Sequence, residues 1–296
     1  MFSSTSTSMI TIPQLNDDQW EDVEFETPDQ FVEHNREKLG IPAFLRINEC
    51  RKRILHWILP TNLSQDSLLK RERVNKSRAC ALICVKLAEY LMQFGIMLPE
   101  ILFNKKGKNT EEKIFNIMGY PLPPRFLNAY VKAIVDGNKV YNKRPTESGF
   151  GVEEALTLMG SGMVLVQRSK RAYAGKLHGY MRQAIDIIHK DEKLSRLKQV
   201  FFLLGSVSHC ILVIYQPWNK TIAYVDSSGH HDDGGTFVMC RESQLVYFCR
   251  AMILRMHMQR DSFCLYWIAR KEKDSILPTP LLFSLAKKSS RQYVIN

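Results

Sequence analysis

Residues 79–94 restrict the possible folds most strongly, because they are apolar on almost every side of a helix. Such a helix has no solvent-facing side, so it has to lie inside the protein with other elements packed around it. Asn75 or Ser77 is placed to cap its start, and Gly95 to end it. We therefore expect the first half of the chain to be built around a buried central helix that begins at Cys80.

Other helices are predicted around this central helix. Residues 33–59 are predicted to be helical up to Pro60, and another helix is expected over residues 109–118. A third is predicted over residues 125–135, where Gly137-Asn138 supplies a stop signal. The first half of the chain is therefore expected to be mainly helical.

After Gly149 the pattern changes to short apolar runs, which are typical of buried strands. The strand-like runs are 162–167, 200–204, 210–215, 221–225, 236–239 and 263–268, and helices are predicted at 152–159, 180–193 and 241–256. The turn at 216–220 predicts a hairpin between two of these strands. Helices first and antiparallel strands afterwards indicate an α+β fold.

The expected domain organisation is an acidic arm and one domain. Residues 1–32 are predicted to be a flexible acidic arm, because they are rich in Ser and Thr, then acidic, with few apolar anchors. Residues 33–296 are expected to form a single domain, with a helical lobe at about 33–150 and a sheet lobe at about 151–296. No apolar run reaches the ~18–20 residues that span a bilayer, so no membrane association is expected.

The seven cysteines indicate a reducing compartment. Their number is odd and their spacing fits no disulfide framework. Residues 1–8 have neither the basic region nor the apolar core of a secretory signal. We therefore expect a cytoplasmic or nuclear protein with reduced thiols.

The charge distribution suggests a second class of function. Residues 1–33 hold eight acidic and no basic residues, which leaves 41 basic and 22 acidic residues in the remainder, a net charge of +19. Basic clusters occur at 51–53, 70–73 and 168–171. Such a surface attracts polyanions, so a non-catalytic nucleic-acid-binding or scaffold protein is the alternative function. No recognised nucleic-acid-binding motif accompanies the charge.

Cys80 is the candidate nucleophile. A thiol attacks as its thiolate, which a helix N-terminus and basic neighbours such as Lys76 and Arg78 favour. Asn75 is placed to contribute an amide to an oxyanion hole. Cys84 lies one turn later and is expected to be deeper and less ionised. The alternative is that both cysteines are small buried apolar residues.

His209 and Asp226 are the candidate base and its orienting group. His209 opens one predicted strand and Asp226 closes the next. Counted inward from the turn, Tyr215 is expected to face Thr221, and Cys210 to face Asp226. His209 and Asp226 are then within hydrogen-bonding reach at one end of the hairpin, as the orientation of an imidazole requires.

Two other uses of these residues remain open. His230 follows Asp226 closely and is an alternative base. Several residues of this region are also potential zinc ligands: His209, Cys210, His230, His231, Asp232, Asp233 and Cys240. They show no spacing typical of a zinc site, so no metal and no cofactor is expected.

Taken together, these segments resemble papain-like deubiquitinating and ubiquitin-like-specific proteases of the herpesvirus tegument, OTU-like and Ulp-like groups. The matching segments are 75–80, the strand led by His209, 224–228 followed by Gly234-Gly235, and the helix at 242–252. The resemblance implies a papain-like fold whose nucleophile helix packs on a mainly antiparallel sheet.

The resemblance also implies a thiol peptidase or isopeptidase that acts on conjugates of ubiquitin or a ubiquitin-like protein. In that reading Cys80, His209 and Asp226 are catalytic and Asn75 lines the oxyanion hole. The chain departs from the patterns of these groups at three points. The tegument type has Asp-x-His, whereas Asp226 and His230 are two residues further apart. Ulp-like enzymes have His-Trp at the start of the strand, where this chain has His209-Cys210. Their cysteine also follows the aspartate, whereas Cys80 precedes Asp226. An inactive relative that only binds is therefore also open.

Overall fold

The structure is a computed structural model that describes residues 27–43, 45–51, 53–68, 77–100, 121–159, 162–207, 209–229, 233–258 and 261–270. Residues 1–26 of the expected arm, the helix expected over 109–118, Asn75 and His230 lie outside these ranges. Residues 28–32, which the sequence assigned to the arm, form the start of helix α1 (Pro28–Asn35). Phe31 and Val32 of this helix are buried in the core.

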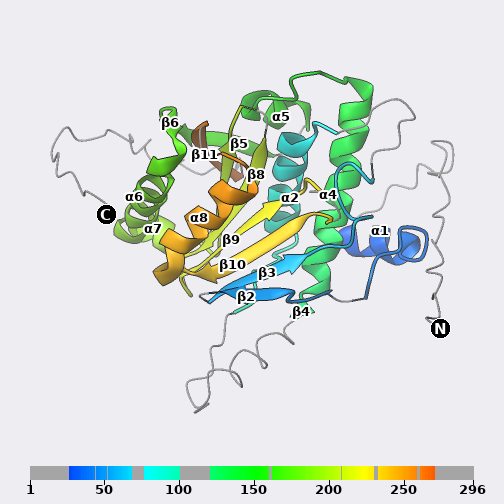
Figure 1. Ribbon diagram of the computed structural model, residues 1–296, viewed down its shortest axis with the longest axis horizontal. Helices are drawn as coiled ribbons and strands as arrows, with labels where there is room; N and C mark the ends of the chain where they lie inside the picture. Colours follow the sequence, from blue (N-terminus) through cyan, green and yellow to red (C-terminus); the bar gives the residue numbers. More distant parts are fainter. Residues whose placement is uncertain are drawn as a thin grey trace, which may run out of the picture.

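One antiparallel sheet runs through the centre of the molecule (Figure 1). Within the described residues its order is β2-β3-β10-β9-β8-β7-β11-β5, and β6 pairs with β11. Its strands are β2 (Glu49–Arg51), β3 (Ile54–Ile58), β5 (Met163–Arg168), β6 (Ala172–Tyr173), β7 (Val200–Gly205), β8 (Cys210–Gln216), β9 (Thr221–Asp226), β10 (Thr236–Arg241) and β11 (Ser262–Arg270). A separate two-stranded pair joins β1 (Leu45–Arg46) to β4 (Pro121–Leu122). The predicted α+β class with a mainly antiparallel sheet is confirmed.

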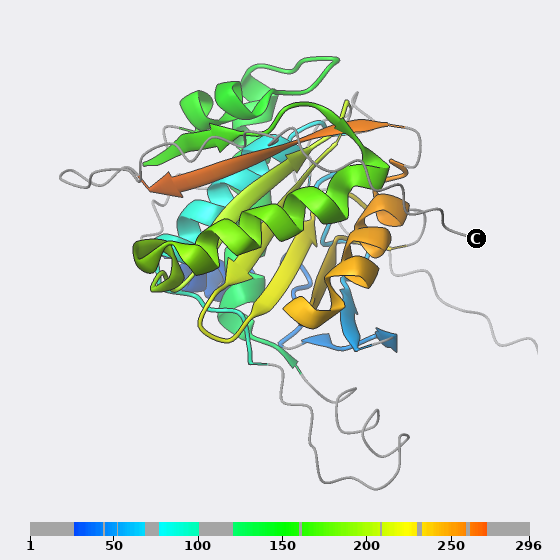
Figure 2. The ribbon, with the colours of Figure 1, turned by 90° about the vertical axis from the view of Figure 1, so that its left-hand side faces the viewer.

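Helices cover both faces of the sheet (Figure 2). One face packs on α1, α2 (Cys80–Gln93), α4 (Pro124–Lys143) and α5 (Val152–Leu158), and the other on α6 (Leu177–Lys190), α7 (Glu192–Ser195) and α8 (Leu245–Arg255). No helix in the described ranges combines the length and apolarity needed to cross a bilayer.

The sequences of the central strands are continuous apolar runs because both faces of the sheet are buried. In β8, Leu212 and Ile214 belong to the apolar cluster on the α2 side, whereas Ile211 and Val213 belong to the cluster on the α6 and α8 side. Every residue of β8 and β9 is buried. Side chains of successive strand residues point to opposite faces, so the alternation fills both helical layers.

The prediction of a helix over residues 33–59 is wrong beyond α1, because this segment forms strands β1, β2 and β3. Arg53 takes a left-handed conformation (φ 64°), which turns the chain between β2 and β3 and interrupts any helix. Trp57 is paired with Phe237 of β10, and the two ring centroids lie 5.1 Å apart. A short apolar run fits either period, and here contact with β10 selects the strand.

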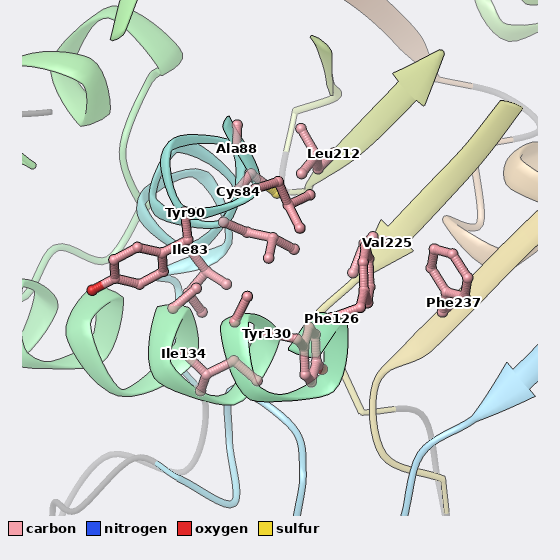
Figure 3. Close-up of a cluster of buried hydrophobic side chains, with 14 of the residues drawn as sticks. Ile83, Cys84, Ala88, Tyr90, Phe126, Tyr130, Ile134, Leu212, Val225 and Phe237 are labelled. Atoms are coloured by element: carbon pink, nitrogen blue, oxygen red, sulfur yellow. The ribbon is translucent and has the colours of Figure 1, made fainter. Parts of the chain in front are cut away.

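The stop signal predicted at Gly137-Asn138 is also wrong, because α4 continues to Lys143. A Cβ atom on Gly137 would lie 2.6 Å from Cγ1 of Ile83. The glycine therefore allows α4 to approach α2 closely. Figure 3 shows side chains of the two helices, including Ile83, Tyr130 and Ile134, packed together beside the sheet.

Candidate active site

Cys80 is the first residue of α2, the helix that the sequence placed at the centre of the fold. The side-chain oxygen of Ser77 accepts a hydrogen bond of 3.2 Å from the backbone N–H of Ala79, one residue before the helix. The helix packs along β8, and Cys80 is 8% exposed. Its thiol therefore lies at the positive end of the helix dipole, where an anion is favoured.

His209 and Asp226 meet at one end of the β8–β9 hairpin, in a register one residue from the predicted one. Gln216 pairs with Thr221 and Tyr215 with Ile222, rather than Tyr215 with Thr221. The loop is therefore only four residues long, and it closes with Lys220 in a left-handed conformation (φ 53°).

The difference does not separate the two residues. The observed register between β8 and β9 ends at the Leu212–Val225 pair, and His209 and Asp226 lie beyond that pair at the same end of the hairpin.

The carboxylate of Asp226 orients the imidazole of His209. Nε2 of His209 lies 3.0 Å from Oδ1 of Asp226, and the backbone N–H of Ser228 donates to the same oxygen at 2.9 Å. The Ser228 hydroxyl lies 3.3 Å from Nδ1 of His209. Asp226 is 0% exposed, whereas the side chain of His209 is 14% exposed. With one ring nitrogen engaged by Asp226, the other is the proton acceptor of the neutral imidazole.

The environment raises the pKa of His209 well above its usual value. Burial alone disfavours the imidazolium, but the negative charge of Asp226 and side-chain hydrogen bonds to Asp226 and Cys80 outweigh it. His209 therefore interacts with both Asp226 and Cys80. The hairpin that carries His209 and Asp226 and the start of α2, which is distant in the sequence, form one connected group.

Cys84, one turn further along α2, has a different environment. It is 2% exposed, and its Sγ lies 3.6 Å from the backbone oxygen of Cys210. Burial is the main cause that raises its pKa well above the ordinary thiol value. Figure 3 shows Cys84 on the sheet-facing side of α2, near Leu212. The expectation that Cys84 is deeper than Cys80 is confirmed by its burial, and the raised pKa of Cys84 agrees with the expected low ionisation of its thiol.

Arg255 is a residue of this region that the sequence did not reveal. It is the last residue of α8, with Nε 3.8 Å from Oδ2 of Asp226 and Nη1 3.9 Å from Oδ2 of Asp233. The predicted helix over 241–256 contained Arg255, but nothing in its pattern linked the last turn to Asp226. The buried carboxylate of Asp226 thus has Arg255 near one oxygen and His209 near the other.

The glycine pair at 234–235 holds the loop before α2 against the sheet. A Cβ on Gly234 would lie 2.0 Å from the Pro60 oxygen, and one on Gly235 would lie 1.8 Å from the Tyr130 hydroxyl. The N–H of Gly235 donates to the Leu63 oxygen at 3.1 Å. Only glycine allows this contact, which explains the pair in structural terms.

The other predicted features are placed only in part. Asn75 and His230 stay predictions, because they lie outside the described residues. Within the described ranges, no group of three or more His, Cys, Asp or Glu side chains is arranged to hold a metal. In the basic cluster at 168–171, Arg168 forms an ion pair of 3.4 Å with Glu153, and its guanidinium lies over the Tyr266 ring.

The fold of the chain is similar to that of a solved structure. No family model matches the chain, and no curated protein matches its sequence. A solved structure that it resembles is the ubiquitin-specific protease encoded by murine cytomegalovirus tegument protein M48, in complex with a ubiquitin-based suicide substrate. The match has 13% sequence identity and a TM-score of 0.39, and it covers 75% of this chain and 90% of that chain. At this distance, the chemistry has to be assigned from the geometry of the site.

Proposed function

We propose that the protein is a papain-like thiol peptidase or isopeptidase, with Cys80 as nucleophile, His209 as general base and Asp226 as the group that orients it. The observation that carries this proposal is the connected Cys80–His209–Asp226 group at the N-terminus of a buried helix. A cysteine next to an imidazole that a carboxylate orients is the arrangement that nucleophilic catalysis requires.

The proposed reaction proceeds in two halves. The Cys80 thiol gives its proton to His209, and the thiolate attacks the carbonyl carbon of the scissile bond. The tetrahedral intermediate collapses when His209 returns the proton to the departing amine, which leaves an acyl-thioester on Cys80. His209 then takes a proton from water, the hydroxide attacks the thioester, and the acid product leaves as Cys80 regains its proton.

Asp226 acts on His209 in both halves of this reaction. It holds Nε2, so that the ring presents its other nitrogen for proton transfer. Its charge stabilises the imidazolium that forms when the thiolate is generated, in agreement with the raised pKa of His209. Because Asp226 is fully buried and the His209 side chain is 14% exposed, water screens this interaction only weakly.

We propose conjugates of ubiquitin or a ubiquitin-like protein as the substrates. The basis is the sequence resemblance to proteases of that class at 75–80, the strand led by His209, 224–228 followed by Gly234-Gly235, and 242–252. The bond to be cleaved is then the amide between the modifier's C-terminal glycine and an amine of the target.

Reaction with ubiquitin-propargylamide, followed by mass spectrometry, tests both the nucleophile and the substrate class. We expect the wild-type protein to form a covalent adduct on Cys80, Cys80→Ala to form none, and the matched variant Cys84→Ala to react normally. An adduct that survives in Cys80→Ala would refute the assignment of the nucleophile. If neither ubiquitin nor any ubiquitin-like probe reacts, the proposed substrate class is wrong.

A further inference from the structure

A buried cluster of hydrogen bonds joins the two halves of the site behind Cys80 and Asp226. It consists of Gln65, Ser77, Asn138 and Ser227, all of which are buried. Gln65 lies in the loop that follows β3, Ser77 precedes α2, Asn138 belongs to α4, and Ser227 follows β9. Gln65 and Ser77, which are 12 residues apart, therefore meet Asn138 and Ser227 from distant parts of the chain.

Gln65 is the centre of this cluster. Its side-chain Nε2 donates to the backbone oxygen of Ser77 at 2.9 Å, and its Oε1 accepts from the Ser227 hydroxyl at 2.9 Å. Its backbone N–H donates to the backbone oxygen of Ser227 at 2.8 Å, and its own backbone oxygen accepts from Nδ2 of Asn138 at 2.8 Å. The Ser77 hydroxyl donates to Oδ1 of Asn138 at 2.8 Å, which closes the cluster.

The two ends of the Gln65 side chain reach the two sides of the site. Ser77 lies three residues before Cys80 and its hydroxyl bonds the backbone just before α2. Ser227 directly follows Asp226, whose carboxylate holds His209. The amide of Gln65 thus connects the start of the nucleophile helix to the strand end that carries the orienting group.

We propose that Gln65 is a positioning residue that sets the distance between Cys80 and the His209–Asp226 pair. This inference rests on the proposed function, because it concerns the geometry of the same three residues. Only an amide fits the role, since it donates to the Ser77 oxygen and accepts from the Ser227 hydroxyl at once. A reacting group misplaced by about 1 Å can lose about 100-fold in rate, so a small shift of α2 is sufficient to impair the site.

Gln216 provides a matched control within the same sheet. It is also fully buried, and its Oε1 accepts from the backbone N–H of Leu98 at 2.8 Å. It lies at the turn end of β8 and β9, whereas His209 and Asp226 lie at the opposite end. Replacing Gln216 by Met therefore removes a comparable buried amide without touching the site.

The test measures how fast iodoacetamide alkylates Cys80 in the full-length chain at about pH 6.5, near the ordinary pKa of histidine. Tandem mass spectrometry separates Cys80 from Cys84. The variants are Gln65→Met, Gln216→Met and His209→Gln, and denaturant midpoints are recorded for each. Ser227→Ala, which removes a single hydrogen bond of the cluster, serves as a milder variant should Gln65→Met fail to fold.

We expect His209→Gln to slow alkylation of Cys80, Gln65→Met to slow it to a similar rate, and Ser227→Ala to slow it less. Gln216→Met should lower the denaturant midpoint but leave the rate unchanged. If Gln65→Met and Ser227→Ala react like the wild type while His209→Gln is slow, the positioning role is wrong and the proposed function stands. An equal slowing in Gln216→Met would also overturn it. If His209→Gln itself reacts like the wild type, the proposed function fails.

Discussion

Replacing Asp226 with Asn tests whether the site holds a charged pair. The variant keeps a neutral acceptor for Nε2 of His209 and for the N–H of Ser228, which lie 3.0 and 2.9 Å from Oδ1. It loses the negative charge that faces His209 and Arg255. Shape and hydrogen-bond number are thus preserved, and the charge is removed.

The expected loss of stability follows from these contacts. A hydrogen bond to a charged group contributes about 1.5–3 kcal/mol and a neutral one about 0.5–1.5 kcal/mol, so two bonds lose roughly 2 kcal/mol together. Removing one partner of a fully buried ion pair costs about 3–5 kcal/mol, but the side chains of His209 and Arg255 are 14% and 20% exposed, so solvent reduces this contribution. We therefore expect Asp226→Asn to lower the free energy of unfolding by about 2 kcal/mol at about pH 6, where Asp226 is charged.

The loss should depend on pH in a defined direction. The pKa of His209 is raised in the folded protein, so its pairing with Asp226 stabilises the fold fully at pH values below the unfolded-state pKa of about 6.5. This stabilisation is lost as the pH rises through the folded-state pKa of His209. Urea unfolding of the wild type and of Asp226→Asn, from about pH 6 to pH 10, measures this difference. Both proteins also carry Cys80→Ala, which removes the neighbouring thiol from the comparison. A difference that stays constant over this range would refute a charged His209–Asp226 pair.

Three further perturbations test the surroundings of the site. Arg255→Met should lower the free energy of unfolding by about 1–3 kcal/mol, because it leaves the Asp226 carboxylate with one cation fewer. In urea unfolding, the double variant Asp226→Asn/Arg255→Met should lose less free energy of unfolding than the two single variants lose in sum. An additive result would contradict the coupling of Asp226 and Arg255. Gly235→Ala should lower the melting temperature strongly, since its Cβ would overlap the Tyr130 hydroxyl. Gly179→Ala, in open space on α6, should raise the free energy of unfolding by about 0.5–1 kcal/mol; equal effects of the two alanines would contradict the packing.

The sequence predicted much of the fold because its strongest patterns are local. The all-round apolar character of α2 and the runs of β7, β8 and β9 identify elements that are buried on every side. The error at residues 33–59 arose where the pattern was short and ambiguous. There the partner strand β10, distant in the sequence, decides the structure.

The site could be predicted only in outline. Cys80, His209 and Asp226 are visible because each lies at the end of a predicted element, and hairpin counting brings the last two together. The register was wrong by one residue because the left-handed Lys220 shortens the loop, which no propensity of lysine indicates. Gln65 and Arg255 give no local signal, since their roles depend on contacts with segments far away in the chain.

The most direct test of the central claim is the alkylation rate of Cys80 in the wild type and in His209→Gln, measured across pH. If Cys80 and His209 act as one unit, Cys80 in the wild type should react with iodoacetamide faster than in the variant at about pH 6.5, and this advantage should shrink as the pH rises and His209 loses its proton. Identical profiles in the two proteins would show that His209 does not activate Cys80, and would contradict the proposed active site.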